Sequence, residues 1–313
     1  MNGYVDLQLN GYSGGDFNDE TITDAQLKAV CERLAIDGVD AVLATIITAT
    51  PAQMLARIRR VVKFCETHPT ESKVIAGLHI EGPFISNEKG YFGAHPLAKV
   101  LPADLELAKR MIDAGGGHVR MMTLAPELDV GLRLTSYLSG KGILVSGGHA
   151  NPTLIELSRA IDAGLSMWTH LGNGSPGLLP RHDNVIQRVL SFAEHLTITF
   201  IADGHHVPSF ALRNYMNLAP LDRVVVVSDA MLAAGLGPGK FRFADQTVEI
   251  DANGAAWCED KTHLAGSAVT LPQVEVVLRN QLRASDTQVT AWMRDNAMRL
   301  LSMQRLSQKG NRN

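Results

Sequence analysis

The run V-I-A-G-L-H-I-E-G-P (74–83) is an apolar, β-rich segment that ends on a carboxylate, Glu81, just before the chain enters a loop. Three later runs share this plan and end on His149, His170 and Asp229: G-I-L-V-S-G-G-H (142–149), L-S-M-W-T-H-L-G-N-G (165–174) and R-V-V-V-V-S-D-A (223–230). In a parallel β/α barrel every strand delivers its last residue to one shared face. In that fold the four polar side chains would converge.

Short β-branched runs alternate with amphipathic helical runs along the chain, which is the pattern of βα units that build a parallel sheet. Strands are expected near residues 4–9, 40–48, 74–80, 119–125, 142–148, 166–171, 196–202 and 223–229. Helices are expected near residues 23–37, 51–67, 102–115, 129–139, 152–164, 183–194, 208–218 and 272–284, with a further helix at 286–303. The predicted fold class is α/β, a single (β/α)8 TIM barrel over residues 1–303, followed by a flexible tail over 304–313.

Two longer segments interrupt the alternation. Residues 84–100 contain two glycines and the motif G-A-H-P (93–96), and a connection of this length is typical of an active-site loop. Residues 235–268 predict a β-hairpin insertion after the last barrel strand, with its turn near Asn253-Gly254.

Composition excludes several classes of protein. The 313 residues include 29 basic and 32 acidic side chains, so the net charge of −3 offers no general attraction to nucleic acid or to an anionic membrane. No apolar stretch reaches the roughly 20 residues of a membrane span, and the N-terminus lacks the features of a signal peptide. Cys31, Cys65 and Cys258 are scattered, as in reduced proteins. We expect a cytoplasmic protein that acts on a small molecule.

The predicted site is a metal centre. Glu81, His149 and His170 would supply one carboxylate and two imidazoles from three strand ends, leaving a fourth position open for water. A bound divalent ion lowers the pKa of such a water to about 7. Taken singly, each residue also fits a plainer explanation, an ion-paired carboxylate or a hydrogen-bonded core histidine. Zinc is the ion that we expect, and iron, cobalt and manganese accept the same ligands.

Further polar residues surround these strand ends. Asp229 follows four valines and is suited to move a proton to and from water, although a helix cap or a structural ion pair would also explain it. His95 and His206 lie in loops beyond the third and seventh strands, where they can contact a substrate or simply face solvent. His79 precedes Glu81 by two residues, so in a strand both point to the same side, toward the barrel mouth.

The glycine-rich segment after His170 is a candidate anion site. Asn173 and Gly174 offer backbone N–H groups that can form a nest for an anion, and Arg181 is the nearest cation. An ordinary loop with a surface arginine explains the same residues equally well.

Nine motifs together carry a resemblance to a known family: Q-L-N-G (8–11), G-L-H-I-E-G-P (77–83), G-A-H-P (93–96), T-L-A-P-E (123–127), V-S-G-G-H-A-N-P-T-L (145–154), T-H-L-G-N-G (169–174), I-A-D-G-H-H-V (201–207), V-S-D-A (227–230) and L-A-G-S (264–267). In this order, the set resembles the N-acetylglucosamine-6-phosphate deacetylases of the amidohydrolase superfamily. The resemblance implies that Glu81, His149 and His170 hold the metal. It also implies that Asp229 is the general base and then the acid, and that His95 polarises the acetyl carbonyl.

The resemblance extends to the substrate. It implies that His206 contacts the sugar phosphate and that Asn173 and Gly174 donate backbone contacts. The arginine that matches Arg181 reaches the phosphate of the neighbouring subunit in this family, which implies a homodimer.

The first motif bears on the metal count. Gln8 and Asn10 match the members in which Gln-x-Asn replaces the first-strand His-x-His of the superfamily. Those members typically use one divalent ion per subunit. We also expect Gln8, Asn10 and His79 to lie in the substrate site.

Two departures from the family matter. Its members normally carry a small β-sandwich domain built from both chain ends, whereas this chain starts at the first strand and stops after the last helix, which predicts a barrel-only variant. In P-G-L-L-P-R-H-D-N (176–184), His182-Asp183-Asn184 stand where the family usually has an acidic residue followed by Pro-Gly. Because selectivity resides in such loops, the reaction type is better determined than the substrate.

The sequence therefore predicts a metal-dependent deacetylase that converts N-acetylglucosamine 6-phosphate to glucosamine 6-phosphate and acetate. Two alternatives stay open. One is an amidohydrolase that acts on a different N-acyl amino sugar or small amide, and the other is a catalytically silent barrel used for binding.

Overall fold

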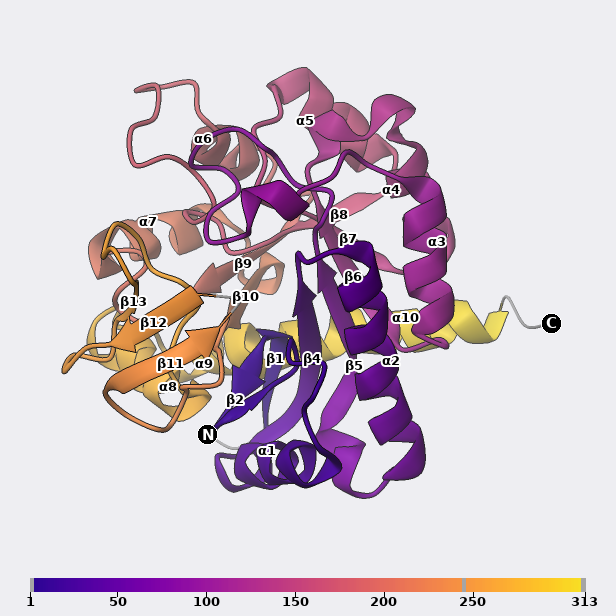
Figure 1. Ribbon diagram of the computed structural model, residues 1–313. Helices are drawn as coiled ribbons and strands as arrows, with labels where there is room; N and C mark the ends of the chain where they lie inside the picture. Colours follow the sequence, from indigo (N-terminus) through magenta and orange to yellow (C-terminus); the bar gives the residue numbers. More distant parts are fainter. Residues whose placement is uncertain (1–2, 244–245, 311–313) are drawn as a thin grey trace.

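Eight parallel strands form the central barrel of the computed structural model, which describes residues 3–243 and 246–310 and, for 304–310, the backbone alone (Figure 1). In order around the barrel they are β1 (Tyr4–Leu9), β4 (Val39–Ile47), β5 (Ile75–Glu81), β6 (Val119–Leu124), β7 (Leu144–Gly147), β8 (Leu165–Trp168), β9 (Thr197–Ile201) and β10 (Val224–Val227). The ring is joined where Asp229 N donates to Gln8 O at 3.0 Å and Asn10 N donates to Ala230 O at 2.8 Å. The predicted TIM barrel is confirmed.

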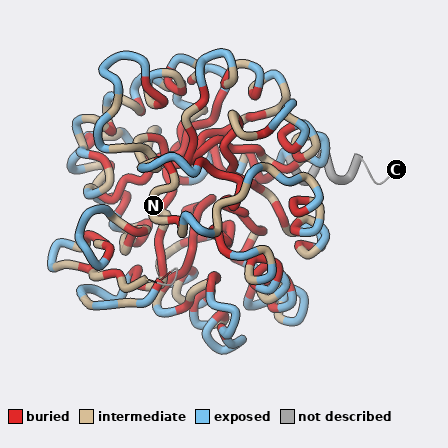
Figure 2. Tube along the Cα trace, turned by 45° about the horizontal axis from the view of Figure 1, so that its top comes forward, coloured by how far each residue is buried: buried red, intermediate tan, exposed pale blue. Residues whose placement is uncertain are grey.

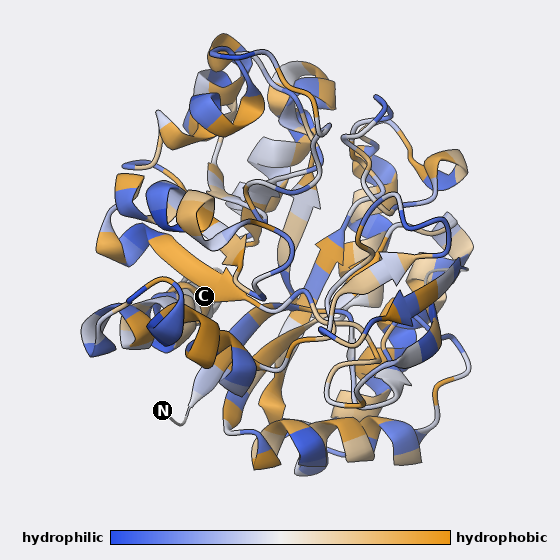
Figure 3. Ribbon diagram, turned by 90° about the vertical axis from the view of Figure 1, so that its left-hand side faces the viewer, coloured by the Kyte–Doolittle hydropathy of each residue, from blue (hydrophilic) through white to orange (hydrophobic). Residues whose placement is uncertain are grey.

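Helices pack around the outside of the strands (Figure 1). They are α1 (Asp24–Ile36), α2 (Pro51–Thr67), α3 (Leu105–Ala114), α4 (Arg133–Gly140), α5 (Leu154–Asp162), α6 (Val185–Leu190), α7 (Ser209–Leu218) and α8 (Leu271–Asn280). Local sequence sets several starts, because Thr23, Thr50 and Thr153 each form a reciprocal capping box with the residue three positions on. The buried, apolar strands lie inside this shell of half-exposed helices (Figures 2 and 3).

The last helical segment closes the bottom of the barrel. It comprises α9 (Asp286–Thr290), a π-helical turn (Ala291–Asp295) and α10 (Asn296–Gly310), which crosses behind the strands in Figure 1. Ala297 and Leu300 pack with Val5, Leu7 and other inward residues from the strand starts. The helix runs past the boundary predicted at 303. Residues 311–313 and the side chains from 304 on lie outside the described part, so the flexibility of the tail stays a prediction. The barrel-only organisation stays a prediction as well.

The insertion after β10 is a three-stranded antiparallel sheet, so the single predicted hairpin was incomplete. It comprises β11 (Gly239–Phe243), β12 (Gln246–Ile250) and β13 (Ala256–Cys258). The predicted turn at Asn253-Gly254 is present, and it joins β12 to β13. The Asp251 carboxylate stabilises it by accepting from Asn253 N at 2.8 Å and Ala255 N at 3.0 Å. One apolar face of this sheet packs against Ile47 at the end of β4 and against Met231 and Ala233 beyond β10. A two-stranded ribbon, β2 (Gly11–Tyr12) and β3 (Gly15–Asp16), was not predicted.

None of the helices in the described part of the chain has both the length and the apolar composition needed to cross a bilayer.

A buried carboxyl group after β6 makes stability depend on pH. Glu127 Oε1 accepts from Asn151 N at 2.6 Å, while Oε2 is buried without a hydrogen-bond partner. Burial raises the pKa of Glu127 from 4.5 to about 7. Since the folded value lies above the unfolded one, the contribution to stability is fully present below about pH 4.5 and is lost as the pH rises through about 7.

Glu127→Gln should therefore be about as stable as the parent protein at about pH 4, and more stable by on the order of 2 kcal/mol at about pH 8. The amide keeps the acceptor for Asn151 and removes the charge. Urea unfolding at the two pH values measures this difference. An equal effect of the substitution at both values would contradict the assignment.

Candidate active site

A cavity of about 520 Å³ opens at the carboxyl ends of the barrel strands. Its walls include all four residues that end the runs first noted in the sequence: Glu81, His149, His170 and Asp229. Glu81, His149 and His170 are at least nine-tenths buried, and Asp229 is partly buried. Residues that are far apart in the sequence are thus brought together by strand topology.

The backbone is unusual at three of these four positions. His149, His170 and Asp229 have positive φ values of 52°, 32° and 48°. Left-handed backbone costs a residue with a Cβ about 1–2 kcal/mol. Such conformations persist where surrounding structure enforces them, and they cluster at functional sites. Three left-handed residues after three barrel strands therefore indicate a functional site at this end of the barrel, maintained at some cost in stability.

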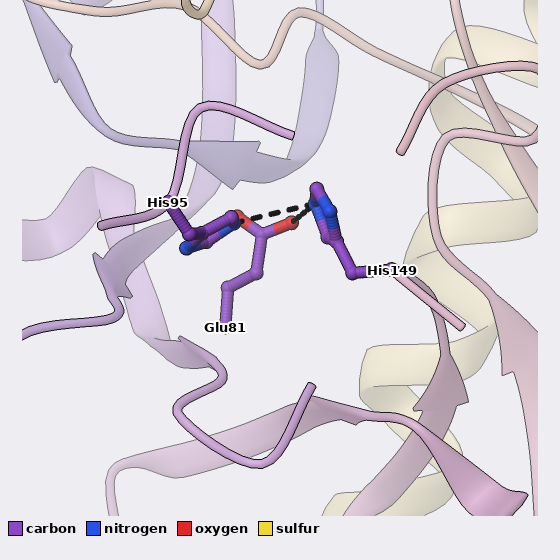
Figure 4. A group of neighbouring side chains, drawn as sticks. All are labelled: Glu81, His95 and His149. Carbon is purple, nitrogen blue, oxygen red and sulfur yellow. Dashed lines mark hydrogen bonds and ion pairs between the residues drawn. The ribbon is translucent and has the colours of Figure 1, made fainter. Parts of the chain in front are cut away.

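Glu81 is the hub of the polar cluster. Its Oε1 lies 3.0 Å from His170 Nε2 and 3.4 Å from His149 Nε2. His95 Nε2 lies 3.3 Å from His149 Nε2, and Figure 4 shows Glu81, His95 and His149 facing one another. Among the described residues, the ligand atoms of these last three all lie within 4.8 Å of one another. His170 contacts Glu81 but is not part of that mutually close set.

The donor set suits a divalent cation. His149 Nδ1 lies 2.8 Å from Tyr91 O, and because a carbonyl only accepts, this nitrogen carries the proton. In neutral His149 the Nε2 lone pair then faces the Glu81 carboxylate at 3.4 Å. A cation between the two acceptors removes their repulsion, and a carboxylate with imidazoles is a common ligand set for zinc and its neighbours. The cluster can therefore hold a metal ion.

Burial and charge set the protonation of the cluster. Burial opposes the charged form of Glu81, but the neighbouring imidazoles of His149 and His170 outweigh it and hold the pKa of Glu81 well below its usual range. Burial, with His149 nearby, lowers the pKa of His95 to about 3, so this imidazole is neutral at pH 7. Burial and the charge of Glu81 raise the pKa of Asp229 to about 6. Glu81 is thus kept ionised, while Asp229 can exchange a proton near neutral pH.

Two amide side chains hold Asp229. Asn10 Nδ2 donates to Asp229 Oδ1 at 2.7 Å. Gln8 Nε2 lies 3.1 Å from both Asp229 Oδ1 and Glu81 Oε1, so it bridges the two carboxylates. Both amides use Oδ1, and neither engages the second oxygen. Asn10 lines the cavity, whereas Gln8 lies beneath it and acts on the carboxylates.

The loop residues predicted for the substrate lie on the cavity wall. His95, His206, Asn173 and Gly174 all line it. His206 Nδ1 is held by Asp203 Oδ2 at 2.7 Å. The sequence reading missed Asp203, although a carboxylate three residues before His206 at a strand end was a usable signal.

A glycine is required where the loop passes His149. Added at Gly174, a Cβ would lie 2.8 Å from His149 Nδ1, closer than side-chain contacts allow. The backbone therefore passes directly over the imidazole, which only a residue without a side chain permits.

Besides Gln8, two predicted residues do not line the cavity. His79 is fully buried one layer deeper, with Nε2 2.8 Å from Thr123 Oγ1. Arg181 is exposed and lies outside the residues that line the cavity of its own chain. Their roles as substrate contacts stay predictions. Conversely, Lys89, Phe243 and His263 line the cavity without having been singled out; Lys89 belongs to the predicted active-site loop and the other two to the insertion.

Comparison with known proteins agrees with this geometry. No family model matches the chain. An N-acetylglucosamine-6-phosphate deacetylase from Bacillus subtilis is 30% identical over 304 residues, covering 96% of this chain and 75% of the relative. The chain belongs to the N-acetylglucosamine-6-phosphate deacetylase family. The resemblance noted in the sequence is thus confirmed.

Other members of the deacetylase family match over similar lengths. The mouse deacetylase is 33% identical over 297 residues, which are 92% of this chain and 70% of that protein. The crystal structure of the deacetylase from Mycobacterium smegmatis superimposes with a TM-score of 0.87 at 27% identity, covering 96% of this chain and 78% of that one. A mutant of that enzyme has been solved in complex with N-acetyl-D-glucosamine-6-phosphate. An N-acetylgalactosamine-6-phosphate deacetylase from Escherichia coli O157:H7 is 28% identical over 281 residues, 89% of this chain and 71% of that protein.

Proposed function

We propose that this chain is a hydrolase that removes the acetyl group from N-acetylglucosamine 6-phosphate, yielding glucosamine 6-phosphate and acetate. The observation that carries the proposal is the placement of Asp229, a carboxyl with its pKa raised to about 6, in one cavity with Glu81, His149 and His170. The names of its relatives supply the substrate class.

Glu81, His149 and His170 would hold one divalent ion, for which we propose zinc. When bound, this ion supplies polarisation of the acetyl carbonyl and a water whose pKa is near 7. His95 is the alternative to His170 as third ligand, since it lies closer to His149. We favour His170 because it lies two residues after a barrel strand, as His149 does, whereas His95 lies in a long loop.

Asp229 would move the protons. In its ionised form it accepts a proton from the attacking water, and in its protonated form it delivers that proton to the departing amine nitrogen. Asn10 and Gln8 fix the carboxylate for both transfers. Neutral His95 would donate a hydrogen bond to the acetyl oxygen as negative charge develops there.

Other residues that line the cavity would bind the sugar phosphate. Lys89 brings a positive charge to the cavity, and His206, oriented by Asp203, presents its other ring nitrogen. The backbone N–H groups around Asn173 and Gly174 add donors without a charge. These groups favour an anionic sugar over a neutral one.

The test is acetate release from a matched set of substrates. We expect turnover of N-acetylglucosamine 6-phosphate and a kcat/KM at least about 100-fold lower for unphosphorylated N-acetylglucosamine, since losing a charged partner costs several kcal/mol. Equal rates would overturn the phosphate assignment. A preference for N-acetylgalactosamine 6-phosphate, the substrate named for one relative, would support the alternative amino sugar. No release from any N-acetyl sugar would favour a silent binding barrel.

We infer a homodimer in which Arg181 serves the partner's site. Support comes from its position, because Arg181 is exposed and outside its own cavity, on a loop that also exposes 93% of Leu178. An arginine reaching across an interface would add a second positive charge for the phosphate besides that of Lys89.

Arg181→Ala should raise the KM for the phosphorylated sugar about tenfold or more, the effect of losing a charged hydrogen bond. Mixing Arg181→Ala with inactive Asp229→Asn chains would then create hybrid dimers with one site that has both residues. We expect wild-type KM in these hybrids. A mixture that keeps the KM of Arg181→Ala alone would show that the arginine acts in its own subunit or nowhere.

A further inference from the structure

A second cluster of metal-ligand side chains lies at the tip of the three-stranded insertion, in the segment C-E-D-K-T-H (258–263). Cys258 ends β13, and Asp260 and His263 lie in the turn that follows. Cys258 Sγ is 2.9 Å from Asp260 Oδ1 and 3.4 Å from His263 Nδ1. The ligand atoms of all three lie within 4.8 Å of one another.

The backbone of this turn is folded around the sulfur. Lys261 N donates to Cys258 O at 2.9 Å, and Cys258 N donates to His263 O at 3.1 Å. Lys261 takes a left-handed conformation with φ of 56°, which returns the chain toward Cys258. His263 N donates to Cys258 Sγ at 3.4 Å, a contact that stabilises negative charge on sulfur. Asp260 and His263 are exposed to solvent, whereas Cys258 is buried beneath them.

We propose that Cys258, Asp260 and His263 bind a second divalent cation, of the zinc class, separate from the ion at Glu81. Thiolate, imidazole and carboxylate are the three ligand types that zinc takes in proteins. Around a tetrahedral ion with bonds of about 2.0–2.3 Å, neighbouring ligand atoms lie about 3.3–3.6 Å apart. The sulfur–nitrogen distance already has this value, and the sulfur–oxygen pair needs to open by about half an ångström. Binding displaces the thiol proton that Cys258 shares with Asp260, and water can complete the coordination.

The position of this second site connects it to the cavity. His263 and Leu264 line the cavity, and Trp257 pairs with Leu264 across the base of the turn. A cation at the tip would therefore fix one wall of the substrate pocket. The other two cysteines do not compete, since burial raises the pKa of Cys31 to about 12 and that of Cys65 to about 11.

Cobalt substitution separates the two sites, because only the second one contains sulfur. We expect the full-length chain, stripped of metal and reloaded with Co²⁺, to bind two equivalents and to show a thiolate-to-cobalt charge-transfer band in the near ultraviolet. Cys258→Ser should abolish this band and lose one equivalent. Glu81→Gln should lose the other equivalent and keep the band.

The controls use neighbouring or equivalent groups outside the cluster. Glu259→Gln changes an exposed carboxylate in the same turn, and Cys65→Ser removes a thiol elsewhere; both should keep the band. His263→Ala provides a second variant in case Cys258→Ser misfolds, and it should weaken Co²⁺ binding at this site at least about tenfold. A wild-type protein without the band, or a band that survives in Cys258→Ser, would overturn the second site. Because the readout is spectroscopic, neither outcome depends on deacetylase activity.

Discussion

Replacing Asp229 by asparagine should lower kcat for acetate release by about 10²–10⁴-fold, the usual contribution of a positioned acid or base. Asparagine has the same shape and keeps an oxygen for the Asn10 amide, so the cavity should stay intact. What it lacks is the ability to take up and return a proton. KM should therefore change little, and metal content should match that of the parent.

The pH profile provides the sharper readout. Burial and the nearby charge of Glu81 raise the pKa of Asp229 to about 6. Since the ionised form starts the reaction, kcat/KM of the parent should fall as the pH drops below about 6, and this acidic limb should disappear in the residual activity of Asp229→Asn. Asp113→Asn, at an exposed position on α3, is the matched control and should leave both rate and profile unchanged. A variant with near-parental kcat would remove Asp229 from the reaction.

The sequence predicted the barrel well because each strand carries two signals at once. The strands are apolar nearly throughout, which both covered faces of a barrel demand, and several end abruptly on a polar residue. Once the fold is a parallel barrel, the convergence of Glu81, His149, His170 and Asp229 follows from topology alone. No knowledge of side-chain contacts was needed for that step.

The sequence could not predict how deep each polar side chain lies in the barrel, nor the short-range geometry of the site. Alternation in β5 correctly put His79 on the side of Glu81, but two residues along a strand span about 6.5 Å, which sets His79 one layer below the cavity. Strand β13 has three residues, too few for any periodic pattern. The left-handed backbone of His149 is enforced by tertiary contacts and has no signature in residue type.

The proximity of His95 to His149 was equally invisible, since the two residues come from a long loop and a strand end. His95 and His170 are therefore two candidates for the third protein ligand, after Glu81 and His149. Their consequences differ in a measurable way, because loss of a ligand removes the ion whereas loss of a carbonyl-polarising group removes only rate.

His170→Asn should reduce the bound metal to a small fraction of one equivalent per chain and abolish measurable acetate release. His170 lies 3.0 Å from Glu81 Oε1 at the end of a barrel strand, where a ligand is held rigidly. His95→Asn should retain the metal and lose about 10²–10³-fold in kcat, the cost of removing one donor to a developing oxyanion. Elemental analysis of the purified variants measures the first effect and steady-state kinetics the second.

His195→Asn is the control, at an exposed histidine just before β9, and it should bind metal and turn over substrate as the parent does. The reverse pattern, with metal lost from His95→Asn and kept in His170→Asn, would make Glu81, His95 and His149 the ligand set, as their mutual distances alone suggest. His170 would then act on the substrate through its contact with Glu81. Retention of metal in both variants would show that neither imidazole is indispensable and would overturn the assignment of His170 as the third protein ligand.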